Sequence, residues 1–235
     1  MVDTILVPVE LPDPEPIAPE LVADLASLDI VVLGHYDLPE QTPSGAAREQ
    51  FEAEATEQLE AIAAPFREAG ASVRTRLVFG KDRPTAIDQI AIEEDCVAEL
   101  DPAPTEGINR ILVPLPVIAE FEHLPQFVEL LCQGTDSVLT LFHVVEGDEQ
   151  RARGEEIVTK TREGLLAAGF DAADIETVVV DAENHDKEII RVAGDHDAVV
   201  MYEAESQLGD RIFGTLPDRI REATGDPVIV VRRDY

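Results

Sequence analysis

Short apolar segments alternate along the chain with longer segments of mixed character. The short ones are rich in Val, Ile and Leu, as buried strands are, and in the first half they lie at 4–9, 30–35, 73–78 and 96–100. The mixed segment 49–68 repeats apolar residues at three- and four-residue steps and is followed by Gly70, which predicts an amphipathic helix with a glycine stop. Shorter helices are expected at 18–28 and 85–94. Strands that alternate with helices predict parallel βαβ units.

The same order of segments returns in the second half of the chain. The expected strands are 110–115, 138–143, 175–180 and 198–202, and the expected helices are 121–132, 148–168 and 187–193. The first strands of the two halves share Ile-Leu-Val-Pro, and the second strands share Leu-x-His, which matches His35 with His143. We also match Cys96 to Leu100 with Ala198 to Tyr202. The sequence therefore predicts an internal repeat.

The two halves differ at their ends. After Leu100 the first half has only 101–109, a segment rich in Pro and Asp that suits a linker. The second half continues with a helix at 216–223, opened by Thr215, and a last strand at 227–231. We therefore predict an α/β fold of two doubly wound parallel-sheet repeats. The domains are a truncated repeat at 1–100, the linker, and a complete repeat at 110–235.

Acidic residues dominate the composition. Asp and Glu number 49 against 18 Lys and Arg, so the formal net charge is −31, and this field repels nucleic-acid phosphates and excludes a nucleic-acid binder. The longest apolar run, 111–119, is far shorter than the roughly 18 residues that cross a bilayer, and we expect no membrane insertion. No basic and apolar leader pattern precedes the first strand, which favours a cytoplasmic protein.

The choice of basic residues and cysteines adds two expectations. Lysines occur only at Lys81, Lys160 and Lys187, and an acidic, lysine-poor surface suits a salt-filled cytoplasm, so a halophilic source is favoured over a protein that is merely acidic. Cys96 and Cys132 have no metal-site spacing and are expected to be core side chains.

The order of these segments resembles the universal stress protein family over nearly the whole chain. The likeness rests on the two Ile-Leu-Val-Pro strands, the Leu-x-His strand ends, and the terminal stretch from Gly214-Thr215 to 227–231. The resemblance implies five-stranded parallel α/β domains, of which some bind ATP through a loop of form GxxGx9G[ST] after the fourth strand. It also implies an aspartate at the end of the first strand, near the adenine.

The loop departs from the family pattern. Gly214-Thr215 survives, but counting back places Met201 and Ala204, or Tyr202 and Glu205, where the family has its other glycines. The adenine position holds Pro116 in the second repeat, whereas the first repeat has Glu10 but lacks the loop. Since phosphates are held by closely approached backbone N–H groups, we expect a vestigial nucleotide site.

Its remaining candidate residues are Gly209, Arg211, Gly214 and Thr215. The stretch 209–215 resembles a P-loop without the lysine. Carboxylates crowd the same loop at Glu203, Glu205 and Asp210 and would oppose a polyphosphate unless Mg²⁺ bridged them, although Arg211 could offset part of this charge. Thr215 also suits the N-cap of the final helix.

Two further groups of polar residues are candidates for chemistry. Glu183, His185, Asp186 and Glu188 could bind a metal or act as acid and base, but His196 lies roughly 14 Å from His185 along the intervening helix, too far for one metal to bind both. Acidic helix caps are the favoured explanation. His35 and His143 end matched strands and are expected to hydrogen-bond across strand ends.

Three function classes remain open. The favoured one is a non-catalytic, stress-response-like protein without a cofactor that acts through protein contacts. The second is a sensor that binds ATP or AMP with Mg²⁺, or a regulatory partner of a transporter. The third is a hydrolase that uses 183–188. The resemblance also implies that a final strand pairs with that of a partner domain, and since the first repeat lacks one, we expect a homodimer through Val228, Ile229, Val230 and Val231.

Overall fold

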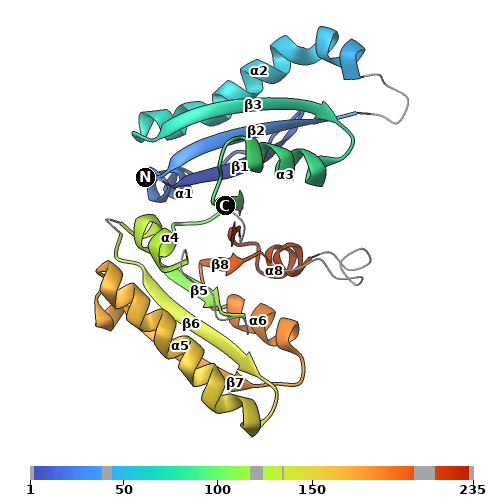
Figure 1. Cartoon of the computed structure of the whole chain (residues 1–235). Coiled ribbons are helices and arrows are strands. Elements are labelled where there is room, and N and C mark those ends of the chain that lie inside the picture. Colours follow the sequence, from blue (N-terminus) through green and yellow to red (C-terminus); the bar gives the residue numbers. More distant parts are fainter. Residues whose placement is uncertain (1–2, 39–43, 117–123, 134, 204–214, 233–235) are drawn as a thin grey trace. The chain divides into compact units, whose positions relative to one another are not determined.

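The computed structural model describes residues 3–38, 44–116, 124–133, 135–203 and 215–232 (Figure 1). The chain divides into two compact units, Met1–Asp101 and Pro102–Arg233. Each is an α/β unit built on parallel strands, and each is described by itself.

The first unit contains four strands and three helices in the described residues. In chain order they are β1 (Thr4–Leu11), α1 (Pro19–Asp24), β2 (Asp29–Asp37), α2 (Ser44–Glu68), β3 (Ser72–Gly80), α3 (Arg83–Glu93) and β4 (Ala98–Asp101). The strands pair in the order β3-β2-β1-β4, and every pair is parallel. The predicted helices at 18–28, 49–68 and 85–94 are present with shifted ends.

Alternate side chains of these strands pack against opposite layers. Val31 and Leu33 of β2 pack against Ile87 and Ile90 of α3. Tyr36, one step out of phase, belongs to a second cluster built on α2. Because successive strand residues point to opposite faces, α2 and α3 cover opposite faces of the sheet, as Figure 1 shows.

The second unit has the same strand order plus one strand. Its elements are β5 (Arg110–Pro114), α4 (Leu124–Leu131), β6 (Val138–Val145), α5 (Asp148–Ala168), a 3₁₀ turn η1 (Ala172–Asp174), β7 (Ile175–Asp181), α6 (His185–Ala193), β8 (Ala198–Tyr202), α8 (Leu216–Thr224) and β9 (Val228–Val231). The strands pair in the order β9-β8-β5-β6-β7, again in parallel. The prediction of α5 at 148–168, closed by Gly169, is confirmed.

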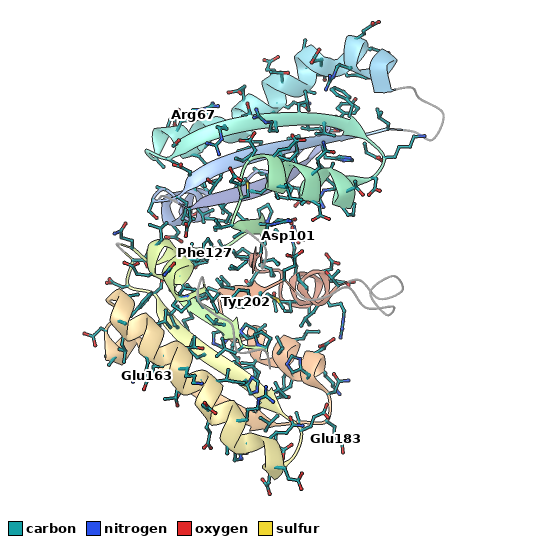
Figure 2. All side chains as sticks on the ribbon, viewed as in Figure 1. Arg67, Asp101, Phe127, Glu163, Glu183 and Tyr202 are labelled. Carbon is teal, nitrogen blue, oxygen red and sulfur yellow. The ribbon has the colours of Figure 1, made fainter. Side chains whose placement is uncertain are left out.

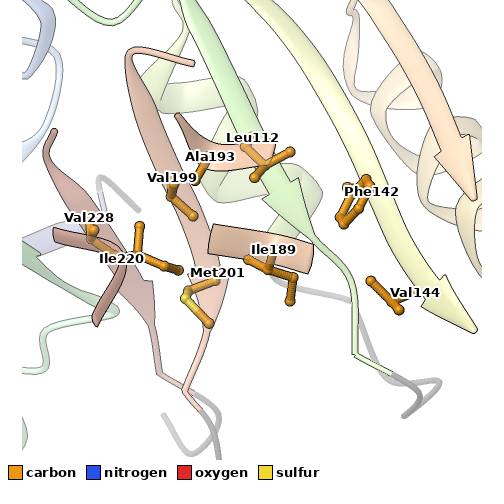
Figure 3. Packing of buried hydrophobic residues seen from close by; sticks show 9 residues of the cluster. All are labelled: Leu112, Phe142, Val144, Ile189, Ala193, Val199, Met201, Ile220 and Val228. Atoms are coloured by element: carbon orange, nitrogen blue, oxygen red, sulfur yellow. The ribbon is translucent and has the colours of Figure 1, made fainter. Parts of the chain in front are cut away.

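The core of the second unit lies between the sheet and helices α6 and α8. Figure 3 shows its nine buried residues, which are Leu112, Phe142, Val144, Ile189, Ala193, Val199, Met201, Ile220 and Val228. The opposite face is covered by α5, where Gly154 lets the helix approach His143 and Val145 of β6 closely. Both cysteines have buried side chains in the core, as predicted.

The segment predicted as a linker packs on the second unit. The guanidinium of Arg221 in α8 donates to the Pro102 carbonyl over 2.9 Å, and the Ser137 hydroxyl donates to the Ile108 carbonyl over 2.6 Å. Ala103 and Ile108 are buried. Residues from Pro102 onward therefore belong to the body of the second unit.

Matching the strands of the two units by register corrects two positions of the expected alignment. Ile5 pairs with Ala98 and Ile111 pairs with Ala198, so Ala98 corresponds to Ala198, not Cys96 as predicted. The strand accordingly begins two residues later than expected. The pattern missed this because Cys96 and Val97 are also buried and apolar.

The second correction concerns the histidines at the strand ends. Ile5 pairs with Ile30 and Ile111 pairs with Leu139, and the same count along β2 and β6 matches Gly34 with His143. His35 is therefore not the counterpart of His143. A shift of one residue places the two rings on opposite faces of their sheets.

Candidate functional site at the carboxyl edge of the second unit

The nucleotide site expected from the sequence would lie at the carboxyl edge of the second sheet, where β5 and β8 end. Met201 and Tyr202 occupy the last two positions of β8, and both are buried. The Met201 side chain packs in the core with Ile220 (Figure 3). Tyr202 is labelled in Figure 2, and its hydroxyl accepts a hydrogen bond from the backbone N–H of Leu124 in α4 over 3.0 Å. Whichever of the two stands for the first glycine, a large core side chain lies there.

The end of β5 is closed by hydrogen bonds to β6. The N–H of Leu115 donates to the Phe142 carbonyl over 2.8 Å. The ring of His143 is 2.8 Å from the Leu115 carbonyl through Nδ1, which therefore carries the proton of this bond. Burial lowers the pKa of His143, and the bond to Leu115 partly offsets the shift. The structural role predicted for His143 is confirmed, although its supposed equivalence to His35 is wrong.

Of the four predicted site residues, only Thr215 can be placed. Gly209, Arg211 and Gly214 lie outside the described residues. The Thr215 hydroxyl accepts the N–H of Asp218, and the Asp218 carboxylate accepts the N–H of Thr215 over 2.8 Å, a capping box that opens α8. The N-cap prediction for Thr215 is confirmed.

The acidic cluster around His185 is organised by arginines and by a helix cap. Asn184 caps α6 by accepting the N–H of Lys187 over 2.9 Å. Asp186 accepts a hydrogen bond from Arg219 of α8 at 2.7 Å, and Glu188 binds Arg191. Within the described parts of the chain, no group of three or more His, Cys, Asp or Glu residues is arranged to hold a metal ion. The residue that caps α6 is therefore Asn184, and not one of the acidic residues as predicted; Asp186 instead joins α6 to α8, and Glu188 pairs with an arginine of its own helix.

The carboxyl edge of the first unit carries a different set of side chains. Glu10 of β1 is the register partner of His35 in β2. Its Oε1 lies 3.7 Å from Nε of Arg83, at the start of α3. His35 is 2% exposed, and Nε2 of its ring has no hydrogen-bond partner. Burial and the charge of Arg83 lower the pKa of His35.

Sequence reasoning missed two contacts at these strand ends. The hydrogen bond from Leu124 to Tyr202 joins residues far apart in the chain, so no local sequence pattern predicts it. The approach of Arg83 to Glu10 could have been suspected, because the β3–α3 turn lies at the edge where β1 ends.

Comparisons with known proteins give the fold. No family model and no curated protein matches the sequence. A universal stress protein of Archaeoglobus fulgidus has a similar structure, with a TM-score of 0.68 at 15% identity over 98% of this chain and 96% of that one. A putative universal stress protein of Pseudomonas aeruginosa gives 0.56 at 15% identity over 99% and 94%.

A third similar structure is the cytoplasmic domain of a prokaryotic cation chloride cotransporter, with a TM-score of 0.55 at 14% identity over 98% and 95% of the two chains. In the described residues of this chain, no helix is long and apolar enough to cross a membrane. Both units, with their parallel strand order and flanking helices, thus have the α/β fold of the universal stress proteins.

Proposed function

We propose that this chain is a non-catalytic protein of universal stress protein-like fold, with a degenerate nucleotide site, that acts through protein contacts. One observation carries the proposal: Met201 and Tyr202 are buried core side chains at the strand end where a glycine loop would begin. A nucleotide phosphate needs close approach to backbone N–H groups, and bulky side chains there oppose that approach. Pro116 at the adenine position removes the expected carboxylate as well.

Three parts of the proposal rest on sequence reasoning. The two units derive from an internal repeat, the protein works in the cytoplasm in a stress response, and it needs no cofactor. The matching strand orders support the first part. The carboxylates of Asp186 and Glu188 are paired with arginines, which argues against their use by a hydrolase.

The alternative is a sensor of ATP or AMP with Mg²⁺, or a regulatory partner of a transporter. The similar cotransporter domain supports only that this fold occurs in such proteins. The two proposals differ in one measurable property, the affinity for nucleotide.

Calorimetric titration of the chain with ATP and with AMP, at molar KCl with Mg²⁺, separates the two proposals. We expect dissociation constants no tighter than about millimolar, equivalent to roughly −4 kcal/mol. The matched control is Gly214→Asp, which places a further carboxylate in the loop and should change nothing. A micromolar constant in the wild type that Gly214→Asp abolishes would contradict the proposal.

Homodimerisation through Val228, Ile229, Val230 and Val231 stays a proposal. Three of these side chains are fully buried in the single chain, so the strand offers less apolar surface than the sequence argument assumed. A dimer would then rest on a self-complementary contact about a two-fold axis. Light scattering at molar KCl should give twice the monomer mass for the wild type and a monomer for Ile229→Pro. A monomeric wild type at tens of micromolar removes the proposal.

A further inference from the structure

Strand β7 is the last strand of the second sheet and, in the described residues, pairs only with β6 (Figure 1). In a parallel pair, successive residues of a strand alternately bond the neighbouring strand and point their N–H and C=O groups away from it. The N–H of Ala182 donates to the Val145 carbonyl of β6 over 3.0 Å, so the even-numbered residues of β7 bond β6. The backbone groups of Thr177 and Val179 therefore point to the open side of the sheet.

The side chains around these groups are β-branched and only partly covered. Val178 and Val180 are half-buried and pack against the core cluster that contains α6. Val179 faces α5, where its Cγ1 would lie 3.3 Å from a Cβ built on Gly154, and Thr177 is exposed. This stretch carries no charge and no proline. A stretch of this kind with outward backbone groups is a template for another extended segment.

The matching edge strand of the first unit, β3, carries charged side chains instead. By register, Arg74 of β3 holds the position of Glu176 in β7, and Arg76 holds that of Val178. Both arginines bind the carboxylate of Glu94, whose side chain is 7% exposed, Arg74 over 2.8 Å. Charges fixed on an edge strand oppose the pairing of a further strand. Of these two matched edges, β7 is thus the one open to a partner.

Carboxylates at both ends of β7 indicate which partner fits. Glu176 lies at its start, Asp181 at its end, and Glu183, labelled in Figure 2, follows; all three are exposed. Arg162 of α5 donates to the Ala172 carbonyl ahead of the strand over 3.4 Å and offsets part of this charge. A second copy of the chain would bring the same carboxylates and a further formal charge of −31, which opposes self-pairing. A segment with basic ends would form charge pairs instead.

We propose that β7 is a docking edge for an extended segment of a partner protein, β-branched in its middle and basic at its ends, which adds a strand to the second sheet. Backbone hydrogen bonds to Thr177 and Val179 hold the segment, and its basic side chains meet Glu176 and Asp181. The two outward residues are about 6.6 Å apart along the strand, which is the repeat of bonding groups in an extended segment. The docking edge gives a location to the protein contacts of the proposed function, and its test does not depend on nucleotide binding.

The first test titrates the chain with a synthetic peptide that has blocked ends, alternating valine and threonine in its middle and two lysines at each end. Because salt screens charge pairs, fluorescence anisotropy is measured at the lowest KCl concentration that keeps the chain folded. We expect saturable binding with a dissociation constant below about 0.1 mM. A twin peptide with glutamates for the lysines, and a lysine peptide with alternate backbone nitrogens methylated, should each bind about tenfold more weakly. Equal binding of all three peptides, or of none, overturns the docking edge.

The second test changes β7 itself. Val179→Pro removes an outward donor but no bond to β6, and should weaken binding of the lysine peptide about tenfold. Leu77→Pro, at the matched outward position of β3, is the control and should leave binding unchanged. Glu176→Arg gives β7 the charge that β3 has at the matched position and should weaken binding several-fold. Glu57→Arg, an exposed change of equal charge on α2, should not.

Amide exchange locates the contact on the strand. With the lysine peptide bound, the N–H groups of Thr177 and Val179 should exchange several-fold more slowly, whereas those of Val178 and Val180, which already bond β6, should not change. Binding that leaves Thr177 and Val179 unprotected, or that survives Val179→Pro, contradicts the proposal. If Val179→Pro does not fold, the comparison of Glu176→Arg with Glu57→Arg still decides. A dimer in light scattering that Val179→Pro abolishes would assign the edge to a second copy and would overturn the proposal as well.

Discussion

In β2 of the first unit Gly34 faces α2, and a side chain built on it would meet Leu11 of β1 at 2.7 Å and Leu59 of α2 at 3.2 Å. In β6 of the second unit His143 holds the matched position, and the facing helix α5 presents Gly154. In the first unit the space beside this strand position is filled by side chains of neighbouring elements, and in the second unit it is filled by His143 of the strand itself. A larger side chain at either glycine would collide with the atoms that already occupy this space.

On the opposite faces of the same strands the contrast is chemical. His35 lies among Glu10, Arg83 and two further carboxylates, whereas Val144 lies in an apolar core. The same strand position therefore stabilises one unit by burial and gives the other a titratable group. The predictions below change one side of this comparison at a time, from the largest effect to the smallest.

Salt should have the largest effect, because it acts on the whole chain. A formal charge of −31 is self-repulsive at about 0.01 M salt, where the Debye length is near 30 Å, and is screened near 1 M, where it is about 3 Å. The melting temperature should rise steeply from low to molar KCl. A melting temperature that calorimetry finds unchanged across this range would argue against a halophilic protein. The stability of variants in the two units could then be compared at any salt concentration.

Val144→His moves the histidine of the first unit into the second. Without the carboxylates that surround His35, the ring should destabilise the fold by about 2–3 kcal/mol at pH 7.5. Denaturant unfolding at molar KCl measures the change, with His35→Val as the matched reverse substitution. A cost below about 0.5 kcal/mol would show that Val144 and His35 are interchangeable and that the polar surroundings of His35 are unimportant.

Gly154→Ala tests how the strand and the helix fill the space beside His143. The added Cβ would lie 2.8 Å from both His143 Cδ2 and Val145 Cγ1, so the fold should lose about 1–3 kcal/mol. Gly45→Ala in α2, where a Cβ meets nothing within 4 Å, is the control and should be neutral or slightly stabilising. Combining Gly154→Ala with His143→Ala should recover part of the loss. If the double variant is no better than additive, the two residues do not share the volume.

Tyr202→Phe tests the end of β8 with the smallest change. It removes the acceptor of the Leu124 N–H and should cost about 1 kcal/mol, seen as a lower denaturation midpoint with an unchanged slope. Nucleotide affinity should not appear in the variant, because the ring still fills the space. Gain of ATP binding would mean that the hydroxyl alone had blocked a working site.

The sequence predicted the positions of the helices and strands better than the register in which the strands of the two units correspond. Strand and helix periodicity located α5 and α8 closely, and Thr215 could be recognised as a cap because its partner Asp218 is only three residues away. The match of His35 with His143 was wrong because the motif Leu-x-His recurs one step out of register. A one-residue offset leaves hydrophobicity unchanged but reverses the face, and only strand pairing reveals it.

At the candidate nucleotide site, the sequence predicted which glycines are absent but not which contacts take their place. The missing glycines at Met201 and Tyr202 are visible in the sequence, but the bond from Leu124 to the Tyr202 hydroxyl depends on the tertiary fold. The polar surroundings of His35 likewise bring together Glu10 and Arg83, which no periodicity links.

The central claim is that the second unit no longer holds a nucleotide. Its most direct test is to purify the chain at molar KCl with Mg²⁺, denature it, and measure released adenine nucleotides by mass spectrometry against the protein concentration. The account predicts no nucleotide above the level found with Gly214→Asp. A near-stoichiometric amount in the wild type, absent from that variant, would contradict it and establish a nucleotide-binding sensor instead.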